Sequence, residues 1–336
     1  MRVETSLPNA DLRTVGPMAA KLEAAGYDGV STQENRHDPY LPLAVAAVNT
    51  TKLGLATSVA IAFPRSPMIA ANIGWDLQRA SGGRFELGLG SQVKGHNERR
   101  FSVPWSAPAP RLQEYIESVR AIWKTWADGD RLDYQGDHYQ FSLMTPNFTP
   151  EPLETAPPTI SIAAVGPAML RVAGRVADGV RLHGFCTREY LEASVLPQLR
   201  AGLDQRGRAH DELTIHGGGF ICTGPDDETV AKAMEWVRYR VGFYGSTRAY
   251  WPVLEQHDLL DLGEKLNHLS KNDGWDKMAA LVSDDVLHLF AAIGRYDQIA
   301  DAIRERFGGI SHGVSLGSGF ELDVPPGVIA DIQAVR

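Results

Sequence analysis

The stretch "RFELGLG", residues 84–90, decides the fold. It is a short apolar run that closes on glycines, and a helical pattern, "SPMIAANIGWDLQRAS", lies directly before it. Strands that read as nearly continuous apolar runs are typical of parallel sheets buried on both faces by helices. The stretch therefore predicts one strand of a parallel sheet.

The same alternation of strand and helix patterns occurs on both sides of this stretch. It is interrupted after residue 100 and resumes near residue 159. Eight candidate strands result: 2–7, 28–33, 53–62, 84–90, 159–164, 179–183, 213–222 and 313–318. Eight parallel strands with intervening helices predict an α/β fold of the (β/α)8 TIM-barrel class. A doubly wound sheet is the main competitor, but it usually has fewer strands.

Two segments lengthen the chain beyond the repeat. The first, near 101–157, holds an amphipathic helix over Arg111–Trp126, a hairpin pattern around Gly136 and a proline-rich run. The second, near 240–290, lies in a helical region that is longer than one barrel helix needs. We predict a single domain over residues 1–336 with these two insertions, because 336 residues fit one barrel plus insertions.

Composition excludes several classes of protein. A net charge of −8 argues against a nucleic-acid binder, and no run of about 20 apolar residues predicts a membrane span. The two cysteines form no CxxC pair, and the first residues lack a signal-peptide pattern, so we expect a cytoplasmic protein. No zinc motif, nucleophile elbow or GxGxxG after the first strand occurs, which favours an organic cofactor without a metal.

Active sites of such barrels lie on the loops that follow the strands. Glu34 and His37 follow the second strand, where they either enter the pocket as acid or base groups or remain solvated. Arg65 follows the third strand, and a surface position is favoured for it over an anion-binding one. Arg181 and His183 belong to the sixth strand end, where the alternation of side chains leaves open which of them faces the pocket.

Two glycine-containing loops are candidates for cofactor contacts. In "GLGSQVKGH", Gly90 allows close approach of the backbone, and Ser91, Gln92 and His96 add polar groups. The charged run that follows, "NERR", is either a solvated helix start or an anchor for an anionic tail. In "AAVGPAML", Gly166 opens a helix whose free N–H groups offer a phosphate site, although a plain helix start is the alternative.

Longer stretches carry a family resemblance. "LATSVAIAFPRSPMIAA", "LQRASGGRFELGLGSQ" and "AAVGPAMLRVAGRVADGV" resemble the bacterial luciferase-like monooxygenase superfamily. "GLGSQVKGHNERRFS", "HDPYLPLA" and "FYGSTRAY" look like its F420-dependent oxidoreductase branch. The match covers nearly the whole chain and implies a luciferase-like barrel with a flavin-like ring at the carboxyl ends of the strands.

The resemblance also implies which residues contact the cofactor. It places a non-prolyl cis peptide at Ser58–Val59, beside the ring. Ring, ribityl and phosphate contacts fall on Gly90, Ser91, Gln92, His96, Ala163, Ala164, Val165 and Gly166, and we add His183. The chain departs from the family at Glu34, where many relatives have a histidine, and at His96, where an asparagine is frequent.

Three functional hypotheses follow. The first is a coenzyme F420-dependent oxidoreductase that transfers a hydride between the deazaflavin C5 and a small organic substrate, with Glu34 or His96 moving the proton. The second is an FMN-dependent two-component monooxygenase, and the third is a cofactor-binding protein that has lost catalysis. Candidate substrate contacts are His37, Phe243, Tyr244 and Tyr250, whose aromatic rings otherwise fill a core. An F420 or flavin reductase is expected as an indirect partner, and a homodimer is left open.

Overall fold

The computed structural model describes residues 1–7, 11–317 and 323–336. These residues form two compact units. The N-terminal unit consists of Ser6–Arg181 and Gln198–Thr214, and the C-terminal unit consists of Met1–Thr5, Leu182–Pro197 and Ile215–Arg336.

The strands of the N-terminal unit are parallel and buried. They are β2 (Gly29–Thr32), β3 (Gly54–Thr57), β4 (Ala60–Ile61), β5 (Phe85–Gly90), β8 (Thr159–Ala164) and most of β9 (Gly179–Leu182). β5 lies between β3 and β8, with Leu55 opposite Phe85 and Leu87 opposite Ile160. The side chains of Leu55, Leu87 and Ile160 are at most 1% exposed. The stretch "RFELGLG" is therefore a central strand, as its apolar run predicts.

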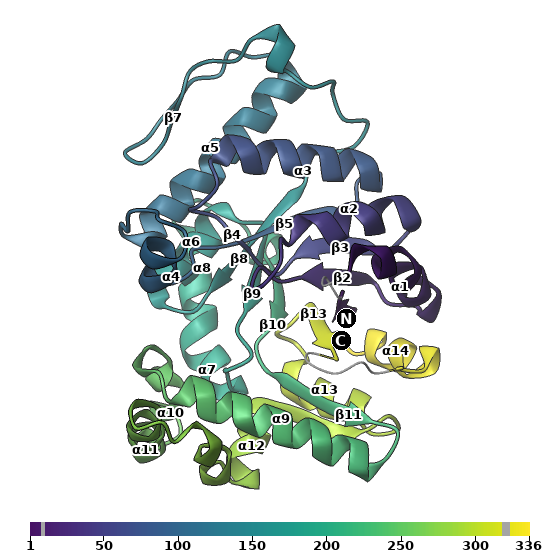
Figure 1. The fold of residues 1–336 in the computed structure, drawn as a ribbon, viewed down its shortest axis with the longest axis vertical. Coiled ribbons are helices and arrows are strands. Elements are labelled where there is room, and N and C mark those ends of the chain that lie inside the picture. The colour runs from purple at the N-terminus through teal and green to yellow at the C-terminus, as the bar shows by residue number, and fades with distance from the viewer. Residues whose placement is uncertain (8–10, 318–322) are drawn as a thin grey trace. The chain divides into compact units, whose positions relative to one another are not determined.

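Helices alternate with these strands in the N-terminal unit (Figure 1). They are α1 (Leu12–Ala25), α2 (Tyr40–Asn49), α3 (Pro67–Ser81), α4 (Lys94–Arg99), α5 (Pro108–Asp128), α6 (Pro167–Val176) and most of α8 (Leu196–Asp204). α1 ends at Gly26, whose φ of 94° lets its N–H reach the last carbonyls of the helix. The predicted hairpin is confirmed as the antiparallel pair β6 (Tyr134–Gln135) and β7 (Gln140–Phe141).

Helix α5 confirms the predicted amphipathic helix of the first insertion. Its buried stripe contains Leu112, Tyr115, Ile116, Val119, Ile122, Trp123 and Trp126. α5 packs against α3, where a Cβ on Gly74 would lie 2.8 Å from Trp123 Cζ2. The indole N–H of Trp123 donates to the carbonyl of Ala71 at 3.0 Å. A glycine at residue 74 is thus what allows the large indole to pack against α3.

The C-terminal unit contains two groups of parallel strands. β1 (Arg2–Ser6) and β10 (Thr214–Gly217) both pair with β13 (Gly313–Leu316). β11 (Phe220–Gly224) and β12 (Ala291–Arg295) form a separate two-stranded sheet. The predicted eighth strand, 313–318, is β13; its last residue, Ser318, lies outside the described residues.

The single strand predicted over 213–222 is wrong. The chain forms β10 and β11 there, which belong to different sheets. Gly217 and Gly218 separate them with φ angles of 78° and 97°, a conformation that glycine adopts without steric cost. The sequence analysis also missed β12, because the apolar pattern before residue 291 is helical and gives no sign of a strand start.

The C-terminal unit contains seven α-helices among the described residues, and several of them form its second insertion. The seven helices are α7 (Arg188–Tyr190), α9 (Asp227–Gly245), α10 (Trp251–Glu255), α11 (Leu260–Lys271), α12 (Asp284–Phe290), α13 (Ile299–Phe307) and α14 (Pro326–Gln333). The predicted insertion near 240–290 thus begins inside α9 and continues through three further helices. Among the described residues, no helix combines the length and apolar character needed to cross a membrane.

Eight strands, β1, β2, β3, β5, β8, β9, β10 and β13, alternate with helices along the chain and pair in parallel. This is the arrangement of a (β/α)8 TIM barrel, which confirms the predicted fold class. In such a barrel the active site lies at the carboxyl ends of the strands.

Candidate functional site

The peptide bond between Ser58 and Val59 is cis. It separates β3 from β4, so the strand predicted over 53–62 is two short strands. The Val59 carbonyl accepts a hydrogen bond from the Glu34 N–H at 3.3 Å. The location implied by the family resemblance is therefore confirmed, and the segment is tied to the end of β2.

Gly90 brings three of the predicted cofactor segments together. A Cβ on this last residue of β5 would lie 2.6 Å from Val59 Cγ2 and 3.8 Å from the Ala163 Cβ. Two residues earlier, a Cβ on Gly88 would lie 1.8 Å from the Thr57 carbonyl oxygen. Because β5 carries no side chain at these two positions, the Thr57 carbonyl and the side chains of Val59 and Ala163 can lie close to its backbone.

Glu34 and Arg65 form an ion pair beside the cis peptide. The Arg65 Nη1 atom lies 2.7 Å from Glu34 Oε2, and its Nη2 atom lies 3.1 Å from Asp38 Oδ2. The side chains of Glu34 and Arg65 are only 8% and 19% exposed. Burial lowers the pKa of Arg65, but the hydrogen bond to Glu34 and the nearby acidic charge outweigh it, so the pKa is raised. The expectation that Arg65 lies on the surface is wrong.

This ion pair holds both sides of Ile61. The Ile61 N–H donates to Glu34 Oε2 at 2.7 Å, and Arg65 Nη1 donates to the Ile61 carbonyl at 3.1 Å. Val59 and Ile61, which both follow the cis bond, therefore contact Glu34 through its backbone and its carboxylate. The geometry makes Glu34 a positioning residue for the segment that follows the cis bond, whereas its predicted role in proton transfer stays a prediction.

His96 lies in a helix and not in a loop. Because α4 begins at Lys94, His96 is in its first turn and is exposed. It lines a surface pocket of about 450 Å³ together with Val93, Gly95, Arg99 and Arg100. The run "NERR" therefore forms the end of this helix and its C-cap. Whether it also anchors an anionic tail stays a prediction.

Asn97 fixes the loop that carries Ser91 and Gln92. Its side chain is fully buried, and Nδ2 donates to the carbonyls of Ser91 at 3.0 Å and Val93 at 3.1 Å. Gln92 adopts a φ of 54°, which is uncommon for a residue with a side chain. The sequence analysis did not predict this role of Asn97. The one pattern that could have indicated it is an asparagine placed within one helical turn after the glycine-containing loop.

The end of β8 leads into the open start of α6. Ala163 and Ala164 close the strand, and Gly166 is the N-cap of a ten-residue helix with Pro167 at its first position. No side chain caps this helix, residues 165–168 are exposed, and nothing lies within 4 Å of a Cβ placed on Gly166. The N–H groups of the first turn are therefore accessible to an anion, as the sequence predicts.

Arg181, whose direction the sequence left open, is buried and pairs with a strand neighbour. Its Nη2 atom lies 2.8 Å from Glu86 Oε1, and its Nε atom lies 3.2 Å from Ser161 Oγ. The arginine therefore completes a polar network with β5 and β8 in the N-terminal unit.

Within the C-terminal unit, His183 contacts two of the predicted substrate residues. Its ring centroid lies 4.2 Å from that of Tyr244 and 4.9 Å from that of Tyr250. Burial, with the positive charge of Arg240, lowers the pKa of His183 to about 4. Phe243 does not join this contact, since its ring packs on Tyr244 and Trp275. His37 is exposed on its loop.

The predicted residues therefore form two groups, one in each unit. Glu34, Ser58, Val59, Gly90 and Ala163 are linked in the N-terminal unit, and His183, Tyr244 and Tyr250 in the C-terminal unit. Within the described ranges, no group of three or more His, Cys, Asp or Glu side chains is arranged to hold a metal ion.

The fold and the segments at its strand ends define a (β/α)8 barrel with a candidate site at the carboxyl ends of its strands. The family model for luciferase-like monooxygenases matches residues 2–311, and the chain belongs to this family.

The chain is also similar to individual proteins and solved structures. An uncharacterized protein of Mycobacterium tuberculosis is 44% identical over 310 residues, which cover 92% of this chain and 91% of that protein. F420-dependent glucose-6-phosphate dehydrogenase of Nakamurella multipartita is 32% identical over 208 residues, 58% of this chain and 59% of the relative. The structure of coenzyme F420-dependent tetrahydromethanopterin reductase from Methanopyrus kandleri matches with a TM-score of 0.77 at 21% identity, over 99% and 96% of the two chains. The chain is thus related to F420-dependent oxidoreductases.

Proposed function

We propose that the protein is a coenzyme F420-dependent oxidoreductase that transfers a hydride between the deazaflavin C5 and a small organic substrate. The observation that carries this proposal is the contact at Gly90, where the end of β5 has no side chain and the side chains of Val59 and Ala163 lie close to it. A surface of such short side chains suits the close approach of a flat ring.

The residues present fit the parts of such a cofactor. Ser58 and Val59 would hold the ring, and Gly90, Ser91 and Gln92 the ring and ribityl chain. The exposed first turn of α6, after Ala163–Gly166, would hold the phosphate, because its free N–H groups and the helix dipole favour an anion. When bound, the deazaflavin supplies the hydride donor or acceptor, which no side chain can provide.

Side chains would hold the cis segment, transfer the proton and contact the substrate. Glu34 and Arg65 hold the cis segment, and both Glu34 oxygens already accept hydrogen bonds. Within the residues that the structure describes, no hydrogen bond or ion pair engages the His96 ring, so we assign the proton transfer to His96 before Glu34. His183 would offer an uncharged N–H to cofactor or substrate, with Tyr244 and Tyr250 against the substrate.

Equilibrium binding tests the proposal. Titration of the purified chain into F420 is expected to give saturable quenching of the deazaflavin fluorescence, and FMN titrated in the same way is expected to bind more weakly. Tight FMN binding without F420 binding would reject the proposal. Saturable F420 binding without turnover of any small organic substrate would instead support the hypothesis of a binding protein.

The second candidate is an FMN-dependent two-component monooxygenase, and membership of the luciferase-like monooxygenase family favours it. It uses the same helix start for the phosphate. Oxygen consumption with reduced FMN and an added substrate separates the two, because a deazaflavin reacts poorly with oxygen.

A further inference from the structure

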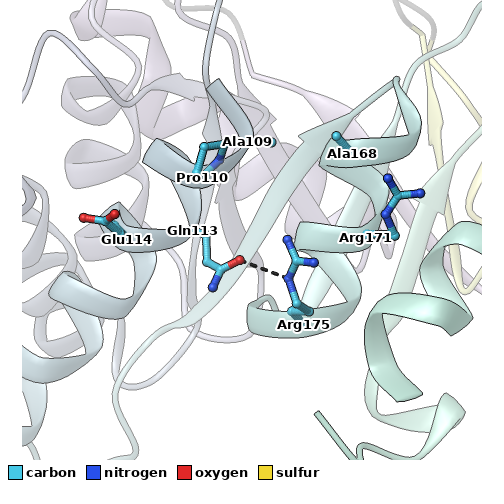
Figure 2. A pocket seen from close by; sticks show the side chains of 7 residues that line it. All are labelled: Ala109, Pro110, Gln113, Glu114, Ala168, Arg171 and Arg175. Carbon is cyan, nitrogen blue, oxygen red and sulfur yellow. Dashed lines mark hydrogen bonds between the residues drawn. The ribbon is translucent and has the colours of Figure 1, made fainter. Parts of the chain in front are cut away.

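Helices α5 and α6 of the N-terminal unit enclose a surface pocket of about 280 Å³ that no predicted site residue lines (Figure 2). Its walls are Ala109, Pro110, Gln113 and Glu114 from α5 and Ala168, Arg171 and Arg175 from α6. Arg171 and Arg175 are four residues apart and therefore lie on one face of α6.

The partners of these two guanidinium groups are neutral. Arg175 Nε donates to Gln113 Oε1 at 3.0 Å, and its Nη1 donates to Gln205 Oε1 at 2.9 Å. Arg171 donates to the side-chain oxygen of Gln198. Three glutamine side chains thus orient the two cations without neutralising them.

Other arginines of this unit behave differently. Arg120 pairs with Asp178 at 2.8 Å, and Arg206 pairs with Glu117 at 2.9 Å. The one carboxylate of the pocket wall, Glu114, is turned away from the arginines in Figure 2 and accepts the His138 N–H at 2.7 Å. Across the part of the chain that the structure describes, no carboxylate forms an ion pair with Arg171 or Arg175, and Glu117, the acidic group whose charge acts on Arg175, is itself paired with Arg206.

Positive charge is concentrated around Arg175. Burial lowers the pKa of Arg175, the charges of Arg171 and Arg206 lower it further, and the charge of Glu117 opposes them only in part. Both pocket arginines are half-buried, so their donors are pre-oriented and still reachable. Such planar guanidinium groups match carboxylates with paired hydrogen bonds.

The pocket continues from the open start of α6. Ala168, in the first turn after Gly166, lines it, and Arg171 and Arg175 follow one and two turns later. A helix rises 1.5 Å per residue, so Arg175 lies about 10 Å along the axis from Ala168. An extended chain needs about three residues to cover that distance.

We propose that this pocket binds the glutamate carboxylates of the F420 tail, beyond a phosphate held at the start of α6. This inference rests on the proposed function and extends it. The pocket would also make the protein bind F420 more tightly than FMN, because FMN ends at its phosphate and has no carboxylate to reach Arg171 and Arg175.

The experiment compares two forms of the cofactor by fluorescence titration: F420 with its glutamates and the form that keeps the phosphate but lacks them. The wild-type chain is expected to bind the glutamylated form about tenfold more tightly at low salt, with the difference shrinking as salt rises. The double variant Arg171→Gln/Arg175→Gln is expected to lose this difference and to keep its affinity for the form without glutamates. Arg131→Gln removes an exposed arginine outside the pocket and is expected to match the wild type.

Each outcome decides between the two proposals. Equal affinity of the wild type for both forms overturns the tail site and leaves the proposed function standing. Failure to bind either form overturns both. Because the double variant could be misfolded, its circular dichroism and unfolding midpoint are compared with the wild type, and Arg171→Lys/Arg175→Lys, which keeps the charges, is expected to restore most of the difference.

Discussion

The Nδ1 atom of His183 accepts a hydrogen bond from the Phe185 N–H at 3.0 Å. An acceptor at Nδ1 requires that the ring proton of the neutral imidazole sits on Nε2. Burial and the charge of Arg240 lower the pKa of this ring to about 4, so it is uncharged at neutral pH. His183 is therefore a fixed hydrogen-bond donor at the end of β9, and not a cation.

This pKa predicts a pH dependence of stability. The unfolded chain protonates His183 below about pH 6.5, whereas the folded chain does so only near pH 4. The stabilisation is thus complete above pH 6.5 and lost as the pH falls toward 4, by about 2–3 kcal/mol. In urea unfolding at pH 7 and pH 4.5, His183→Gln is expected to lose less stability than the wild type. A variant of the exposed His268, His268→Gln, should follow the wild type, and an equal response of both variants would contradict the prediction.

The contact between Gly90 and Val59 predicts a steric effect with a specific rescue. Gly90→Ala places a Cβ 2.6 Å from Val59 Cγ2, and we expect a loss of about 1–3 kcal/mol in the free energy of unfolding. Val59→Ala removes the clashing methyl group, so the double variant is expected to be more stable than Gly90→Ala alone. Gly327→Ala, where no atom lies within 4 Å, serves as the control. A double variant no better than the single one would show that Val59 is not the obstacle.

The buried pair of Glu34 and Arg65 predicts that substitutions of Glu34 lower the free energy of unfolding to different extents. Glu34→Ala leaves Asp38 as the one carboxylate paired with Arg65 among the described residues and removes the acceptor of the Ile61 N–H, which is expected to cost about 3 kcal/mol. Glu34→Gln keeps an acceptor oxygen and is expected to cost about half as much. Chemical denaturation measures both losses, and F420 titration of the same variants tests whether the proposed contact between the cis segment and the ring depends on the ion pair. Equal stability of the three proteins would exclude the positioning role.

The two cysteines are expected to be unreactive in the folded protein. Burial raises the pKa of Cys186 and of Cys222 to about 12, and the thiolate is the reactive form. A chromogenic disulfide reagent at pH 8 should therefore modify neither thiol in the native chain and both after unfolding in urea. Rapid modification of one thiol in the folded protein would contradict this, and Cys186→Ser and Cys222→Ser would identify it.

Patterns in the sequence are sufficient to predict the class of fold, and they indicate which segments form the candidate site. Alternating apolar strands and amphipathic helices are local patterns, because each depends on residues a few positions apart. The stretch "RFELGLG", the helix over Arg111–Trp126 and the hairpin around Gly136 follow from such patterns. The position of the cis bond at Ser58–Val59 came from the family resemblance and not from any local rule.

Which side chains contact one another depends on how distant segments of the chain pack. Arg65 pairs with Glu34 across 31 residues, and Arg175 contacts Gln205 across 30, distances at which no periodicity carries information. The division of 213–222 between two sheets depends on strand partners at residues 291 and 313. Pairing energies between distant segments, together with the exclusion of water around buried charges, fix these contacts, and a linear pattern records neither.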